Sequence, residues 1–145
     1  MSDIESHYQL GGPPKVLCLA LCLLFPFSLW ASGEKIEWSS RVPLIEKKLE
    51  AALSRYQSGS PKEAKTLVSD AYFGIFEAVT ANMEVAIRQN ISQKKAYEVE
   101  NAFVEIRRMI STKKEPSLIH SQIKKVLTEL KSQAAELDRL KAENP

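Results

Sequence analysis

Residues 96–110 of this chain read AYEVENAFVEIRRMI, and this stretch decides the fold class. Its apolar positions follow one another at intervals of 3, 4, 3 and 4 residues. They are Ala96, Val99, Phe103, Ile106 and Ile110. Because this spacing places all of them on one narrow face of a helix, we predict a helix over residues 93–111 that packs through that face.

The same spacing continues on both sides of this stretch. It predicts three further helices, at about residues 43–57, 61–89 and 117–142. Gly59 supplies a left-handed stop for the first of these helices. The run SPKE that follows it combines an N-cap serine, a first-turn proline and a glutamate three residues after the serine. Short connections and the lack of an alternating strand pattern make the expected fold all-α, an up-down antiparallel four-helix bundle.

The composition excludes several classes of function. The chain has 145 residues, of which 44% are hydrophobic, with 20 Lys and Arg against 18 Asp and Glu. This balance of charge is too even to indicate nucleic-acid binding. The sequence also offers no nucleophile–base pair and no fixed set of His or Cys ligands, so we do not expect an enzyme.

The apolar residues are concentrated near the N-terminus. From Val16 to Trp30, 13 of 15 residues are apolar, and one cation, Lys15, precedes them. Their number and the small residues at 31–33 favour a secretory signal peptide that is cut after Gly33. The long, partly acidic leader keeps two alternatives open, an uncleaved membrane anchor and a buried core helix. As signal or anchor, residues 1–33 would place a helical domain of residues 34–145 in the periplasm or another extracytoplasmic space.

Carboxylates are the remaining candidates for chemistry. Asp70, Glu77 and Glu84 repeat every seven residues and so form one row along the predicted second helix. Inward-facing glutamates of helical bundles can hold metal ions, and hard ions such as ferric iron prefer oxygen ligands. On a continuous helix, however, this row lies nearly opposite the apolar stripe that includes Ala71 and Val79, which favours a solvated face.

Two further features flank this row. Glu100 lies beside the apolar seam of the predicted third helix, so we expect this acid to be partly buried. Arg107 follows it on the same row, and a structural ion pair is therefore the alternative to a metal ligand. Phe73 and Phe76 add large apolar surface on or beside the acidic side of the second helix, and we predict that they bind a partner.

The second and third predicted helices resemble a known family. Residues 70–77 read DAYFGIFE, residues 82–88 read NMEVAIR, and residues 100–107 follow the pattern Glu-x-x-Phe-x-x-Ile-Arg. Together they resemble the N-terminal extracytoplasmic domain of the bacterial high-affinity iron permeases, the oxidase-dependent iron and lead transporter family. The family pattern falls on Tyr72, Phe73, Phe76, Glu77, Met83, Glu84, Glu100, Phe103 and Arg107.

The resemblance implies an extracytoplasmic accessory domain of an iron-uptake permease system. It implies ferric iron as a cargo that Glu77, Glu84 and Glu100 receive or guide, with Asp70 in the same row. The implied partner is the membrane part of a permease or a periplasmic iron-donor protein. Because the family's transmembrane Arg-Glu-x-x-Glu motif is absent, we expect no transport by this chain alone. The alternative is a metal-free, membrane-anchored helical interaction or spacer module.

Two departures from the family bear on the site. Asn82 stands where a glycine precedes Met-Glu in the family, and the gap between Glu77 and Glu84 is about two residues longer. Two residues turn a helix by about 200°. If the shorter family spacing brings the two glutamates to one site, Glu77 and Glu84 need not face the same site in this chain.

Overall fold

The computed structural model describes residues 36–143, and every regular element within this range is helical. These residues belong to one compact unit that spans 34–145. The predicted signal or anchor at residues 1–33 lies outside the described part of the chain. Within residues 36–143, no helix combines the length and the apolar character needed to cross a membrane.

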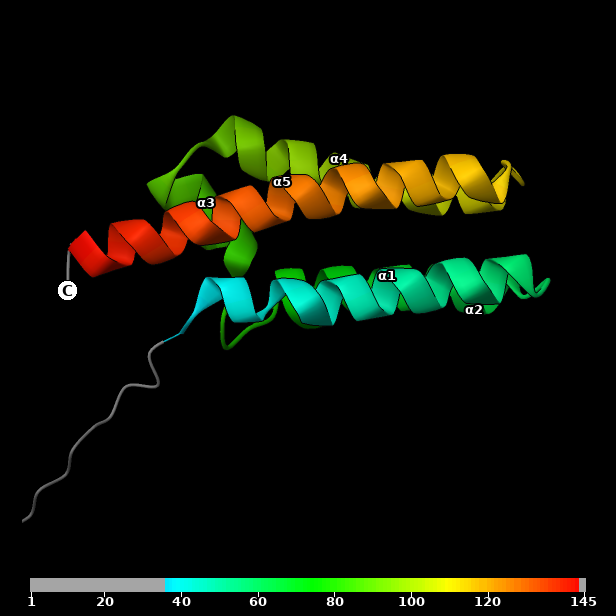
Figure 1. Cartoon of the computed structure of the whole chain (residues 1–145), viewed down its shortest axis with the longest axis horizontal. Coiled ribbons are helices and arrows are strands. Elements are labelled where there is room, and N and C mark those ends of the chain that lie inside the picture. Colours follow the sequence, from blue (N-terminus) through cyan, green and yellow to red (C-terminus); the bar gives the residue numbers. More distant parts are fainter. Residues whose placement is uncertain (1–35, 144–145) are drawn as a thin grey trace, which may run out of the picture. The chain divides into compact units, whose positions relative to one another are not determined.

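The described residues form five α-helices and two shorter helical elements (Figure 1). In chain order these are η1 (Trp38–Ser40), α1 (Val42–Gln57), α2 (Pro61–Ala71), η2 (Tyr72–Phe76), α3 (Met83–Asn90), α4 (Gln93–Ser111) and α5 (Pro116–Glu143). The all-α class and three of the four predicted helices are thus confirmed, since α1, α4 and α5 match their predicted bounds to within one residue. Gly59 has a φ of 83° and ends the first of them, as predicted.

The prediction of a single helix over residues 61–89 is wrong. Its α-helical part ends at Ala71, and residues 72–76 form one π-helical turn, η2, in which the Glu77 amide bonds to the Tyr72 carbonyl at 2.8 Å. An irregular segment follows, in which Val79 is fully exposed instead of lying in the apolar stripe. The helix restarts as α3, because the Asn82 side chain caps it by accepting a hydrogen bond from the Val85 amide at 2.9 Å.

The four longest helices pack lengthwise, and the remaining elements gather at one end. The helix α1 runs beside α2 and also contacts α5, while α4 contacts both α2 and α5. The shorter α3 packs against α4 and α5 at the end where the chain leaves α2. Apolar side chains from all five α-helices fill the space between them, including Leu49, Val68, Ile87, Phe103 and Leu130. The interruption of the second predicted helix therefore lies at one end of the core.

The first and last described elements are joined at this same end. The Asp138 carboxylate on α5 accepts hydrogen bonds from the amides of Trp38 at 2.7 Å and Ser39 at 2.9 Å. The Lys141 ammonium donates to the Ile36 carbonyl at 3.0 Å. Burial would raise the pKa of Asp138, but these hydrogen bonds and the charge of Lys141 outweigh it and lower the pKa.

Candidate metal centre

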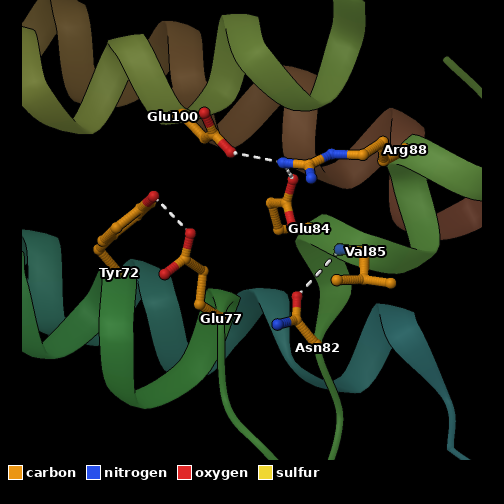
Figure 2. A network of polar contacts seen from close by, with 7 residues as sticks. All are labelled: Tyr72, Glu77, Asn82, Glu84, Val85, Arg88 and Glu100. Carbon is orange, nitrogen blue, oxygen red and sulfur yellow. Dashed lines mark hydrogen bonds and ion pairs between the residues drawn. The ribbon is translucent and has the colours of Figure 1, made fainter. Parts of the chain in front are cut away.

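Three glutamates from three separate segments meet where the interrupted helix turns into α3. Glu77 ends the π-helical turn, Glu84 lies in the first turn of α3, and Glu100 lies in α4. One carboxylate oxygen of each lies within 4.8 Å of those of the other two (Figure 2). The interruption makes this meeting possible, because Glu77 and Glu84 no longer belong to one helix.

A tyrosine fixes the first of these carboxylates. The Tyr72 hydroxyl donates to Glu77 Oε1 at 2.5 Å, and the same two residues are joined through the backbone bond of the π-helical turn. Burial raises the pKa of the Tyr72 phenol above its ordinary value, and the hydrogen bond to Glu77 raises it further. The phenol therefore stays protonated at neutral pH and acts as a donor.

Glu84 is the most deeply placed of the three acids. It is only 4% exposed, so the predicted solvated face is wrong for this residue. Its carboxylate contacts the guanidinium of Arg88, four residues further along α3, and the same guanidinium lies 3.3 Å from Glu100 Oε1. Burial raises the pKa of Glu84, Arg88 acts in the opposite direction, and Glu100 and Glu77 add to the rise.

Aromatic rings form the apolar wall behind this cluster. The ring of Tyr72 lies 5.4 Å from that of Phe103 and 5.9 Å from that of Phe76, measured between centroids. Phe76 and Phe103 are themselves 5.7 Å apart and are buried. These contacts hold the π-helical turn against α4, which keeps Glu77 close to Glu100.

Three of the residues predicted for function lie outside the carboxylate cluster. Asp70 is outside the carboxylate cluster, on the exposed side of α2, where its Oδ2 atom lies 3.4 Å from the ammonium of Lys48. Phe76 is 0% exposed and belongs to the core, so it is not part of a surface patch. Phe73 stays on the surface, at 60% exposure, and its ring and that of Tyr72 form a T-shaped pair. The two phenylalanines differ because the π-helical turn directs one inward and the other outward.

Arg88 is the member of the cluster that sequence reasoning missed. Its spacing of four residues from Glu84 is the ordinary signal for an ion pair on a helix and was available in the sequence. The pair expected for Glu100 was with Arg107, whereas the structure pairs Glu100 with Arg88. The cluster therefore combines three carboxylates with one guanidinium.

This arrangement defines a class, an all-helical domain with a partly buried carboxylate cluster at one end. Carboxylate oxygens are hard ligands that suit hard metal ions, and three of them at this separation can face one ion. Comparison of the chain with protein-family models, with curated proteins and with solved structures finds no match.

Proposed function

We propose that this chain is an extracytoplasmic accessory domain of an iron-uptake permease system, and that Glu77, Glu84 and Glu100 receive or guide ferric iron. The observation that carries the proposal is the convergence of these carboxylates, from three segments, to within 4.8 Å of one another. The motifs that resemble the iron-permease family include the same three residues.

The charges of the cluster favour a highly charged cation. Three carboxylates and one guanidinium leave a formal charge of −2 when all of them are ionised. Holding like charges this close is unfavourable, and burial of Glu84 adds a desolvation cost. A trivalent ion would offset both, so the site gains more from such a cargo than an exposed acidic patch would.

The proposal also assigns roles to the other parts of the chain. Under this proposal α1, α2, α4 and α5 make the up-down four-helix bundle, and α3 closes the end that carries the carboxylates. Residues 1–33 would direct or anchor the domain outside the cytoplasm. The partner would be the membrane part of a permease or a periplasmic iron donor, and the chain itself would neither transport nor catalyse.

A metal-free interaction or spacer module is the second candidate function. The observation that favours it is the pairing of Arg88 with both Glu84 and Glu100, which already supplies a counter-charge. In that case the cluster is a structural ion-pair network. Exposed Phe73 would then be the more important feature, as part of a surface for a partner protein.

Titration calorimetry of the full chain with ferric citrate, in a mild detergent because residues 16–30 are apolar, separates these two functions. We expect binding that weakens by about tenfold or more when Glu77, Glu84 and Glu100 are all replaced by Gln, because three charged ligands are lost. The matched control is Asp70→Asn, an acid of the same row that lies outside the cluster, and it should bind as the wild type does.

Urea denaturation of the triple variant provides the folding control. A folded triple variant that binds ferric citrate as tightly as the wild type would rule out the proposed site. Absence of any binding heat in the wild type would favour the metal-free module.

A further inference from the structure

A cavity adjoins the carboxylate cluster. It has a volume of about 370 Å³ and is lined by Arg88, Gln93, Lys94, Tyr97 and Glu100. Two of these residues, Arg88 and Glu100, also belong to the cluster. The ion pair between Arg88 and Glu100 is thus shared by the cavity and the cluster.

The chemistry of this cavity is the reverse of that of the cluster. Arg88 and Lys94 contribute two cations, and the one carboxylate in the lining, Glu100, is already paired with Arg88. The Lys94 ammonium lies 3.8 Å from the carboxylate of Glu98, and the Lys94 side chain is 84% exposed. The amide of Gln93 adds hydrogen-bond donors. A small anion fits this combination better than a cation does.

The shared arginine links the two sides. A metal ion on Glu84 and Glu100 would compete with Arg88 for the same carboxylate oxygens. The guanidinium stays charged and is about half exposed, so once it is displaced it can bind another anionic partner. A carboxylate group of a chelator that accompanies the metal ion would supply this partner, on the side where the cavity lies.

We infer that the cavity lined by Arg88, Lys94 and Tyr97 holds the anionic part of a ferric chelate, so that the cargo is a complex of ferric iron with a small polycarboxylate. A volume of about 370 Å³ is at the lower end of the range for small-molecule sites and suits an anion of this size. This inference rests on the proposed function, because it assigns the second half of the same substrate.

The test compares a metal ion that brings no chelator with one that does. Terbium(III) chloride in a non-coordinating buffer supplies a hard trivalent ion without an organic anion, and ferric citrate supplies the chelate. Both are titrated into the full chain, by sensitised luminescence and by calorimetry respectively. The variants are Lys94→Gln and Lys94→Glu, and Lys62→Gln is the matched control because Lys62 is an exposed lysine on α2, away from the lining.

We expect Lys94→Gln to weaken ferric citrate binding by about threefold, as for one exposed charge pair, and Lys94→Glu to weaken it further. Terbium binding should stay within about twofold of the wild type in both variants, because Lys94 does not contact the three carboxylates. Lys62→Gln should change neither titration.

Each other outcome overturns the inference in a recognisable way. Equal ferric citrate binding in the wild type and the Lys94 variants, or equal weakening by Lys62→Gln, would reject the cavity as the anion site. Terbium binding without ferric citrate binding would reject the inference and leave the carboxylate site intact. No binding of either probe, or ferric citrate binding that persists in the Glu77, Glu84 and Glu100 triple Gln variant, would reject the inference and the proposed function together.

Discussion

Residues 61–90 and residues 116–143 are stretches of similar length with similar apolar spacing, yet only the second forms one helix. In α5 the buried side chains follow one another along the whole helix, including Ile119, Ile123, Val126, Leu130, Ala134 and Leu137. In the first stretch the buried stripe is interrupted after Phe76, and Val79 is exposed. The difference shows that periodic apolar residues form a continuous helix only where neighbouring helices can cover every turn.

The two stretches also differ in the partners of their buried polar side chains. The buried polar residue of α5 is Gln133, whose side-chain amide donates to Glu129 on the same helix at 2.8 Å. The interrupted stretch instead directs Glu77 and Glu84 toward Glu100 on another helix. A helix break therefore brings together charged groups that a continuous helix would hold apart.

The largest expected effect is a difference in stability between variants of the two phenylalanines in the interrupted stretch. Phe76→Ala should lower the free energy of unfolding by about 3–5 kcal/mol, because it removes a fully buried ring from the core. Phe73→Ala should cost less than about 1 kcal/mol, because that ring is mostly exposed. Urea denaturation followed by circular dichroism measures both values. Similar losses for both variants would mean that the π-helical turn does not orient the rings in this way.

A smaller effect is expected at the restart of the helix. Asn82→Ala should destabilise the chain by about 1 kcal/mol, because the Val85 amide loses the side chain that caps α3. Asn82→Ser is the matched control, since serine is also a good N-cap residue and should retain most of the stability. The urea midpoints of the two variants measure this difference. Equal losses of stability in both variants would contradict the capping role of Asn82.

The smallest expected effect is the contribution of Glu84 to the pH dependence of stability, and we predict the sign of this contribution. Burial raises the pKa of Glu84, so between the unfolded and the folded pKa the native state binds more protons than the unfolded state. This contribution to stability is present at low pH and is lost as pH rises above about 4.5, the ordinary glutamate value. Glu84→Gln removes it, so the variant should gain stability relative to the wild type between pH 4 and pH 7. Urea midpoints measured across this range would contradict the prediction if the difference moved the other way.

Local sequence was enough to predict α1, α4 and α5. Each has a regular apolar face, and α1 ends at a glycine that adopts the left-handed conformation. The break after Phe76 could not be predicted from the same pattern, because Val79 fits the periodic stripe equally well. Contacts between the rings of Phe76, Tyr72 and Phe103 hold the π-helical turn, and such long-range packing is not visible in local spacing.

The candidate site was only partly predictable for the same reason. The resemblance singled out Glu77, Glu84 and Glu100, which the structure brings together. Helix geometry then placed the first two on a solvated face, since it assumed one helix through the whole stretch. The signal that could have corrected this assumption was Asn82, a capping residue just before Met83 and Glu84.

The hydrogen bonds from Trp38 and Ser39 to Asp138 have a consequence for the order of folding. They join positions 100 and 99 residues apart, whereas Glu77, Glu84 and Glu100 lie within one short span of the chain. The entropy cost of closing a loop grows with its length, so the contacts around the carboxylates can form before the ends are joined. During synthesis, residues 77–100 also leave the ribosome well before Asp138 does. We therefore expect the joined ends to be the last part of the domain to close and the first to open.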